Sequence, residues 1–317
     1  MKITEHIERA KGTLFSFELL PPLKGQSIKS IFDNIDPLME FNPPFIDVTY
    51  HREEHIYKQR DFGLLEKVSY RKRPGTVGIC AAIQARYKVD AVPHIICGGF
   101  NKEETENALI DLNFLGIDNI LVLRGDAIKT DGSFVPSPGG HAHAVDLVEQ
   151  ISAMNAGCYM DEDLKDTIQT DFCMGVAGYP EKHFEAPNLK TDLDYLKQKV
   201  DMGAEFIVTQ MFFDNDKYVD FVSRCRDKGI NVPIIPGLKP ITNSKQLINL
   251  PKIFHIDMPE ALCDAVADAK DEKQVKEVGI EWLVQQSKDL IKAGAPVLHF
   301  YTMGTAGPTY RVAKEVF

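Results

Sequence analysis

Short apolar runs alternate with helical stretches along the whole chain, and this repeat constrains the fold more than any other feature. Between the runs, apolar residues recur at helical spacing, as in Ser27 to Phe41 and Thr191 to Gly203. Strands that alternate with helices form a parallel sheet, and eight of them predict a single α/β domain, a closed (β/α)8 TIM barrel over residues 1–317. A doubly wound open sheet is the alternative. The eight strand-like runs are residues 14–20, 45–50, 91–97, 119–123, 172–178, 206–213, 232–238 and 296–302.

Composition limits the classes of partner. The net charge of -10 and a pI near 5.4 argue against nucleic acid as a partner, because most of the surface would repel it. Six scattered cysteines without a C-x-x-C pair suit reduced thiols, and no apolar run is as long as a membrane span. Neither the pair His141 and His143 nor the pair His51 and His55 has a convincing third ligand, so we expect no metal site. These features predict a cytoplasmic protein.

The first run places one carboxyl group in apolar surroundings. In the segment Phe15 to Pro22, alternation points Ser16, Glu18 and Leu20 to one side of the strand. An apolar environment disfavours the charged form, so the pKa of Glu18 should rise and the group could serve as a general acid near neutral pH. A glutamate paired with Lys or Arg, or one facing solvent at a strand end, would fit this segment equally well.

Polar residues end nearly every predicted strand. Active sites of such barrels lie at the C-terminal ends of the strands, so these residues predict a site there. Each one alone could merely satisfy a loop. No phosphate-binding G-x-x-x-x-G-K-[ST] or G-x-G-x-x-G motif is present, which disfavours a P-loop or a Rossmann cofactor site. The polar residues are Glu18, Thr49, Tyr50, His94, Arg124, Asp126, Tyr179, Gln210 and Tyr301.

Taken together, these segments resemble the ordered motifs of the methylenetetrahydrofolate reductase family. The likeness covers nearly the whole chain, which is similar to the short bacterial form, a catalytic barrel without a regulatory domain. The segments are Phe15 to Pro22, Val48-Thr49-Tyr50, Pro93-His94, Leu123-Arg124-Gly125-Asp126, Tyr179-Pro180-Glu181 with His183, Thr209 to Asp214, Ile235 to Leu238 and His299-Phe300-Tyr301-Thr302.

The resemblance implies a flavoprotein that reduces 5,10-methylenetetrahydrofolate to 5-methyltetrahydrofolate by a ping-pong mechanism, with FAD as cofactor and NADH or NADPH as co-substrate. Glu18 resembles the family's general acid, and Asp126 the catalytic aspartate beside the flavin and the pterin ring. Gln210, Gln246 and Tyr301 would bind the folate together with these two acids. The positions that would line FAD are Thr49, Tyr50, His94, Leu123, Arg124, Gly125, Asp126, His143, Ala144, Tyr179, His183, Ala186, Asp192 and Lys199. Of these, Arg124 and Lys199 are the expected partners of the diphosphate.

The chain departs from the family pattern in several places. His51-Arg52-Glu53-Glu54 follows Tyr50 where the family usually has Gly and a small residue. Met303-Gly304-Thr305 replaces a Leu-Asn-Arg run whose Arg meets the folate. Residues 76–88 and 159–170 look inserted, and within the latter Asp161-Glu162-Asp163 is interpreted as a solvated helix start.

Two other functions remain open at this stage. One is a different FAD-dependent barrel oxidoreductase, such as a relative of proline dehydrogenase. The other is a barrel that binds FAD or folate without turnover, which the missing Arg and the unusual His51-Arg52 would explain. We also expect a homo-oligomer, although no apolar stripe identifies the contact surface.

Overall fold

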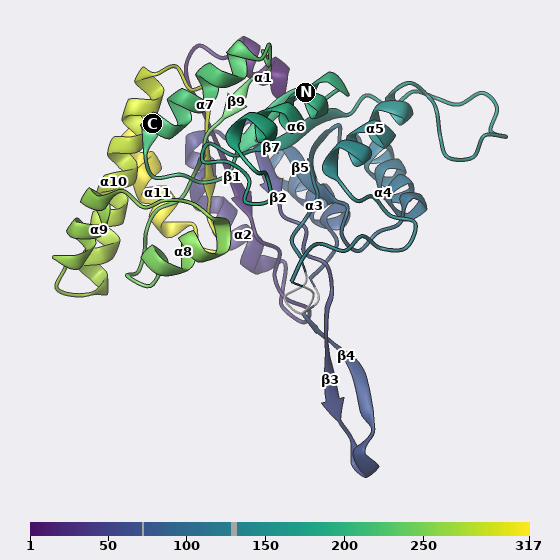
Figure 1. The fold of residues 1–317 in the computed structure, drawn as a ribbon, viewed down its shortest axis with the longest axis horizontal. Helices are drawn as coiled ribbons and strands as arrows, with labels where there is room; N and C mark the ends of the chain where they lie inside the picture. The colour runs from purple at the N-terminus through teal and green to yellow at the C-terminus, as the bar shows by residue number, and fades with distance from the viewer. Residues whose placement is uncertain (72, 128–131) are drawn as a thin grey trace.

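One parallel sheet forms the centre of the computed structural model, which describes residues 1–71, 73–127 and 132–317 (Figure 1). Its hydrogen-bonded order is β10-β11-β1-β2-β5-β6-β7-β8-β9. Since only Pro236 separates β9 from β10, these two act as one strand that joins both ends of the sheet. The predicted eight-stranded barrel is therefore confirmed and the open sheet is excluded. The strands are β1 Leu14–Leu19, β2 Phe45–Val48, β5 Asp90–Ile96, β6 Asn119–Leu123, β7 Cys173–Gly178, β8 Phe206–Thr209, β9 Ile234–Ile235, β10 Gly237–Leu238 and β11 Val297–Tyr301.

Helices surround the barrel and cover the outward side chains of its strands, such as Phe15, Phe17 and Ile46. A capping box begins α4, where Asn101 and Glu104 exchange two hydrogen bonds of 2.8 Å. None of the described helices is both long and apolar enough to cross a membrane. The helices are α1 Ile3–Arg9, α2 Lys29–Leu38, η1 Met39–Phe41, η2 Asp61–Gly63, α3 Thr76–Tyr87, α4 Lys102–Phe114, α5 Ala144–Asn155, α6 Leu189–Asp201, α7 Asn215–Asp227, α8 Gln246–Phe254, α9 Glu260–Ala267, α10 Glu272–Lys292 and α11 Gly307–Val316.

The interior of the barrel has an apolar layer near the N-terminal ends of its strands. We call this set the apolar layer: Phe45, Val92, Leu121, Cys173, Phe206, Val208, Ile235 and Val297. Ile3 and Ile7 of α1 pack against it, so the helix closes this end of the barrel. Burying these side chains removes apolar surface from water, which stabilises the closed sheet.

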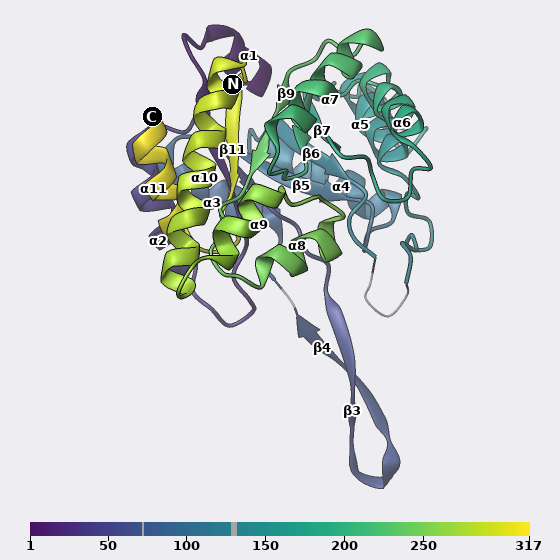
Figure 2. The same cartoon turned by 60° about the vertical axis from the view of Figure 1, so that its left-hand side comes forward.

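The interpretation of residues 76–88 as an insertion is wrong. Thr76 to Tyr87 form α3, the helix that connects β2 to β5 as the barrel repeat requires. The added element comes just before it: β3 (Glu54–Gln59) and β4 (Leu65–Arg71) form a separate antiparallel sheet. This hairpin projects far from the barrel (Figures 1 and 2).

The segment that was interpreted as a helix start at Asp161-Glu162-Asp163 contains no helix. Residues 156–172 form an irregular loop between α5 and β7, and residues 161–169 are exposed. The base of the loop is held by Tyr159, whose hydroxyl donates to the Ile168 carbonyl at 2.9 Å. The apolar residues that follow the acidic run, Leu164 and Ile168, are both exposed, so they give a helix no buried face.

Candidate functional site

A second interior layer follows the apolar layer two residues further along the strands, and it is polar. Because side chains alternate along a strand, Asp47 points inward like Phe45, and His94 like Val92. Register places Glu18 beside both Asp47 and Tyr301. We call Ser16, Glu18, Asp47, His94, His299 and Tyr301 the polar layer. It lies at the C-terminal end of the barrel, where the sequence predicted the site.

His94 lies between two carboxyl groups at the centre of the polar layer. Its Nε2 is 3.5 Å from Oε2 of Glu18 and 3.6 Å from Oδ2 of Asp47. The side chains of Glu18, His94 and Asp47 are only 13%, 6% and 1% exposed. Both separations exceed a normal hydrogen bond, and the Asp47 oxygens have no hydrogen-bond partner within the described part of the chain. The imidazole of His94 thus lies close to two buried carboxyl groups.

The surroundings shift the pKa values of two groups in this trio, Glu18 and His94. Burial raises the pKa of Glu18 to about 7, and the negative charge of Asp47 adds to the rise while His94 opposes it. Burial would lower the pKa of His94, but Asp47 and Glu18 outweigh that effect, so the pKa of His94 is raised. Near neutral pH, a substantial fraction of Glu18 therefore keeps its proton and can donate it, while the raised pKa of His94 shifts that group toward its charged form.

The part of the polar layer next to this trio, on β1 and β11, is fixed by hydrogen bonds. The Tyr301 hydroxyl donates to the carbonyl of Thr209 at 2.6 Å, and the Thr209 hydroxyl accepts from the Gly237 amide at 2.9 Å. A Cβ at Gly237 would collide with the Tyr301 ring, so only glycine fits there. Ser16 and His299 share a hydrogen bond of 2.9 Å between Oγ and Nδ1. These contacts leave Tyr301 little freedom to move.

A cluster of charged and aromatic side chains occupies the loops that follow β6 and β7. Arg124 pairs with Glu185 at 2.5 Å, and the rings of Tyr179 and His183 meet at 4.7 Å. The positive charge of Arg124 acts on the titration of Tyr179, His183 and Glu185, so the four residues share one neighbourhood.

Asp192 and Lys199 of α6 complete this cluster. The Asp192 carboxylate accepts a hydrogen bond of 2.9 Å from the His183 amide, and Lys199 donates to the Ala177 carbonyl at 3.0 Å. Burial lowers the pKa of Lys199 to about 8, although Asp192 opposes the shift. The structure thus brings Arg124, Tyr179, His183, Asp192 and Lys199 together as one group.

The unusual His51-Arg52 run packs over the end of β5. Arg52 donates to the carbonyl of Asp126 at 3.2 Å, and its side chain crosses Gly99, whose φ is +89°. A Cβ at Gly99 would lie 3.2 Å from the Arg52 Cβ, so this close approach favours glycine. The side chain of Asp126 is exposed and acts electrostatically on both His51 and Tyr179.

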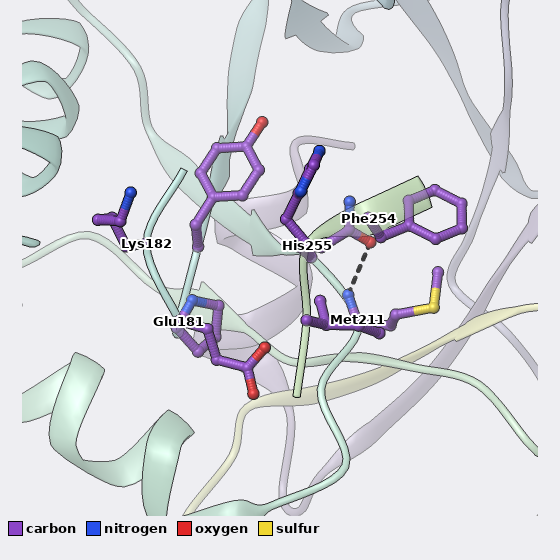
Figure 3. Close-up of a pocket in the computed structure, with 9 residues that line it drawn as sticks. Glu181, Lys182, Met211, Phe254 and His255 are labelled. Atoms are coloured by element: carbon purple, nitrogen blue, oxygen red, sulfur yellow. Dashed lines mark hydrogen bonds between the residues drawn. The ribbon is translucent and has the colours of Figure 1, made fainter. Parts of the chain in front are cut away.

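The two predicted folate glutamines make local contacts. The side-chain oxygen of Gln210 accepts from the Met211 amide at 2.9 Å, and that of Gln246 accepts from the Thr242 amide at 2.7 Å. Figure 3 shows the small pocket beside Met211 and His255, which Gln210 also lines. Its volume of about 10 Å³ has room for no more than one water molecule. These hydrogen bonds hold both side-chain oxygens on nearby backbone amides and do not direct them at Glu18.

The other predicted residues lie in or beside the loops at the same end of the barrel. A cavity of about 220 Å³ lies among Tyr50, His94 and Phe100. Thr49 is buried at the end of β2, and its hydroxyl lacks a hydrogen-bond partner among the residues described. The remaining predicted positions are Leu123 and Gly125 at the end of β6, His143 and Ala144 at the start of α5, and Ala186 in the loop after β7.

The sequence interpretation missed Asp47, Ser16 and His299 as site residues. A signal was available, because each sits at an inward position of a strand whose other inward residues are apolar or catalytic candidates. Asp47 lies between Ile46 and Val48, which both face outward. A charged residue at the inward position of a predicted barrel strand therefore indicates a site.

The fold and this site define a (β/α)8-barrel protein equipped for acid–base chemistry at its C-terminal mouth. The methylenetetrahydrofolate reductase family matches residues 2–316. The chain is 30% identical over 302 residues to 5,10-methylenetetrahydrofolate reductase of Escherichia coli, covering 95% of this chain and 90% of that one. It is 33% identical over 316 residues to methylenetetrahydrofolate reductase (NADH) 1 of Arabidopsis thaliana, covering 96% and 48%. The chain belongs to the methylenetetrahydrofolate reductase family.

Two further findings concern the length of the chain relative to its relatives and its likeness to a solved structure. The chain spans about half the length of the fungal and plant relatives that it matches, and most of the length of the bacterial one. A solved structure of a Clostridium thermocellum protein matches with a TM-score of 0.55 at 13% identity, covering 98% of this chain and 97% of that one. That protein is described as binding two copies of 5-methyl-5,6,7,8-tetrahydrofolic acid. At this identity the likeness supports the fold alone.

Proposed function

We propose that this protein reduces 5,10-methylenetetrahydrofolate to 5-methyltetrahydrofolate, with FAD as cofactor and NADH or NADPH as reductant. The observation that carries the proposal is Glu18, a buried carboxyl group at the barrel mouth whose pKa is raised to about 7. Membership of the reductase family supports the choice of reaction.

Glu18 supplies the proton that the folate needs. The methylene bridge opens to a reactive N5 iminium only after N10 is protonated, and a neutral carboxyl group can donate that proton. Once Glu18 has lost it, the new anion lies 3.5 Å from His94. The positive charge on His94, which Asp47 favours, stabilises the anion and lowers the cost of the transfer.

Several residues of the chain fit FAD by their chemistry. FAD, when bound, would carry the hydride from the nicotinamide to the folate in alternating half-reactions. Arg124 and Lys199 supply cations for its diphosphate, and Arg124 would exchange Glu185 for a phosphate oxygen. The unpartnered Thr49 hydroxyl and the cavity beside Tyr50 offer a donor and space at the same end of the barrel.

Lys239 is our candidate for the cation that binds the folate tail. It directly follows β10, and alternation places it on the inward side like Gly237, while Leu238 faces outward. It is buried, and burial lowers the pKa of its ammonium group to about 8, with no carboxylate of the described residues opposing the shift. A buried ammonium group whose charge no described carboxylate compensates suits a carboxylate of the substrate. It would replace the Arg absent from Met303-Gly304-Thr305.

The Lys239→Met variant tests this assignment. We expect KM for 5,10-methylenetetrahydrofolate to rise about 10-fold, because a charge-assisted contact is lost, with kcat within about twofold. Lys239→Arg should restore most of the affinity. A fall in kcat with KM unchanged would contradict the assignment.

An anaerobic absorbance experiment tests the proposed reaction. The purified protein is loaded with FAD, treated with NADH or NADPH, and then given 5,10-methylenetetrahydrofolate. The flavin spectrum should bleach with the nicotinamide and return with the folate. A flavin that bleaches but is reoxidised only by another imine would favour the proline-dehydrogenase-like alternative, and a protein that binds FAD without turnover would favour the binding function. Failure to take up FAD would overturn the proposal.

A further inference from the structure

A buried serine–histidine pair lies in the polar layer beside the proton donor. Ser16 of β1 and His299 of β11 are opposite each other in the parallel register, and both are 0% exposed. Their side chains share the hydrogen bond of 2.9 Å between Oγ and Nδ1. Burying polar side chains costs stability unless they have polar partners. The partners of this pair therefore indicate whether it belongs to the site.

The second ring nitrogen of His299 faces an acid. Nε2 is buried and has no hydrogen-bond partner among the described residues, and the same is true of both carboxyl oxygens of Asp47. The charges that act on the titration of His299 are those of Asp47 and His94. In the sheet order β11-β1-β2-β5, the strand of Asp47 lies between the strands of the two histidines. Asp47 thus has an imidazole on either side.

The surroundings decide which of the two imidazoles is charged. Burial lowers the pKa of His299, and the positive charge of His94 lowers it further, while Asp47 opposes the shift. Burial would also lower the pKa of His94, but Asp47 and Glu18 outweigh that effect and raise it. His94 is therefore the ring that takes the charge, and His299 stays neutral.

A neutral imidazole bears one ring proton, and the position of Asp47 favours Nε2 of His299 as its site. An ionised carboxylate only accepts hydrogen bonds, so it repels a bare ring nitrogen and attracts an N–H group. With its proton on Nε2, the ring has an acceptor at Nδ1, and the Ser16 hydroxyl donates to it. Ser16 therefore fixes the tautomer that turns a donor toward Asp47.

Three other titratable groups around these residues stay neutral near pH 7. Burial raises the pKa of the Cys80 thiol on α3 and that of the Tyr301 hydroxyl well above their ordinary values, and the charge of Asp47 adds to both shifts. Burial lowers the pKa of His51, on which His94 also acts. The polar layer thus pairs one buried cation, His94, with one buried anion, Asp47.

We propose that His299 is a positioning residue for the proton donor: held by Ser16, it donates to Asp47 and keeps this carboxylate charged and turned toward His94. His94 then stays charged and stabilises the anion that remains on Glu18 after its proton has moved to N10 of the folate. The four supporting side chains keep their own protons throughout this step. The inference rests on the proposed folate reduction and extends it to residues that act through His94.

NMR of histidine ring nitrogens tests the protonation states without turnover. The purified protein is labelled with nitrogen-15 histidine, and the signals lost in His94→Asn and His299→Gln assign two of the nine histidines. His299 should be neutral at pH 7, with its proton on Nε2. Asp47→Asn should move the titration of His94 to lower pH, because the neighbouring negative charge is lost. A charged His299, or a His299 proton on Nδ1, would overturn the proposal.

The two half-reactions test the role of His299 in catalysis. His299→Leu removes the donor, so reoxidation of the flavin by the folate should slow about 10-fold at pH 7, while bleaching by the nicotinamide stays within about twofold. His299→Gln should restore most of the rate, because its amide can donate in place of Nε2. Equal slowing of both half-reactions in folded His299→Leu would show a merely structural role and overturn the proposal.

Two serine variants provide a matched pair. Ser16→Ala should slow reoxidation by the folate about threefold, because the tautomer of His299 is no longer fixed. Ser287→Ala is the control, since Ser287 of α10 is equally buried and lies outside the polar layer. It should leave both half-reactions unchanged. The same slowing in both serine variants would contradict a specific role for Ser16.

A double-mutant cycle shows whether the effect passes through His94. In the His94→Asn background, His299→Leu should cause no further slowing, because the charge that it maintains is already absent. Independent effects that multiply to about 100-fold would overturn the proposal. If the folate does not reoxidise the flavin of the wild-type protein, the proposed reaction fails, and the histidine spectra then decide the inference by themselves.

Discussion

The apolar layer and the polar layer occupy the same barrel, and often the same strand, yet they have opposite effects on the stability of the fold. Phe45 and Asp47 are two residues apart, as are Val92 and His94, and each pair points inward. The apolar layer contributes stability through burial. The polar layer holds charged or proton-bearing groups out of water, which costs stability. The difference teaches that the N-terminal half of the interior supports the burial of Glu18 in the C-terminal half.

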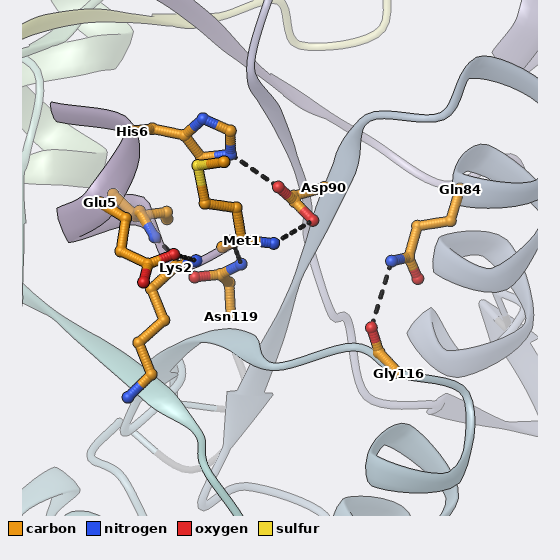
Figure 4. A network of polar contacts seen from close by, with 9 residues as sticks. Met1, Lys2, Glu5, His6, Gln84, Asp90, Gly116 and Asn119 are labelled. Atoms are coloured by element: carbon orange, nitrogen blue, oxygen red, sulfur yellow. Dashed lines mark hydrogen bonds and ion pairs between the residues drawn. The ribbon is translucent and has the colours of Figure 1, made fainter. Parts of the chain in front are cut away.

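Polar groups at the N-terminal end of the barrel, in contrast, are paired. His6 Nε2 lies 2.6 Å from Asp90 (Figure 4). Asn119 forms hydrogen bonds of 2.8 Å with the backbone of both Met1 and Ile3. Burial would raise the pKa of Asp90, but its hydrogen bond with His6 and nearby positive charge outweigh burial and lower it. These contacts fix α1 against the barrel. In the polar layer, by comparison, Asp47 and His94 Nε2 have no hydrogen-bond partner in the described structure.

The largest expected effect comes from breaking the apolar layer. Phe45→Ala should lower the free energy of unfolding by about 3 to 5 kcal/mol, because it removes a fully buried ring and leaves a cavity. Urea denaturation measures this loss. Phe114→Ala, at an exposed position, should stay within about 0.5 kcal/mol of wild type. Equal losses for the two variants would contradict the role of the apolar layer.

A smaller effect should follow from His94→Asn in the polar layer. His94 lowers the pKa of Glu18, so its removal should raise the pH at which the folate half-reaction declines to above about 7. The rate at pH 7 should fall about 10-fold, because the Glu18 anion loses its neighbouring positive charge. Stopped-flow reoxidation at several pH values measures both the pH of the decline and the rate at pH 7.

The control for this variant is His255→Asn. His255 is exposed and has a φ of 54°, a conformation that Asn accepts. The His255→Asn variant should leave the pH profile of the folate half-reaction unchanged. A profile that His94→Asn shifts to lower pH would show that the histidine does not act on Glu18 as described.

The smallest effect is expected from His6→Asn at the N-terminal end. The pKa of Asp90 is depressed in the folded state, so its contribution to stability is present above the unfolded pKa near 3.8 and is lost as pH falls below that value. The variant should therefore lose about 0.5 to 1 kcal/mol at pH 7 and less at pH 3, with unchanged activity. Urea denaturation at the two pH values measures the difference. An equal loss at both would rule out the His6–Asp90 contact as its source.

The sequence predicted the barrel because each strand is a compact apolar run and each helix has apolar spacing. It identified Glu18 because a lone carboxyl group interrupts such a run. It did not reveal the hairpin of β3 and β4, since solvent covers both faces of these strands and their apolar residues form no buried stripe. The grouping of Arg124 with Lys199 depends on loops that bring distant segments together, so only the family resemblance suggested it. Residue spacing alone could not reveal that His94 lies between Glu18 and Asp47.

The central claim is that Glu18 is the proton donor of the polar layer, and the two half-reactions of the Glu18→Gln variant test it most directly. Nicotinamide should bleach the bound flavin within about twofold of the wild-type rate, whereas reoxidation by 5,10-methylenetetrahydrofolate should slow about 100- to 10,000-fold, the usual range for a lost general acid. The fold should be intact at pH 8, because burial raises the pKa of Glu18 from 4.5 to about 7, so the wild type loses stability as pH rises from 4.5 through about 7, a penalty that glutamine lacks. Reoxidation at the wild-type rate, or loss of both half-reactions in the folded variant, would contradict the account.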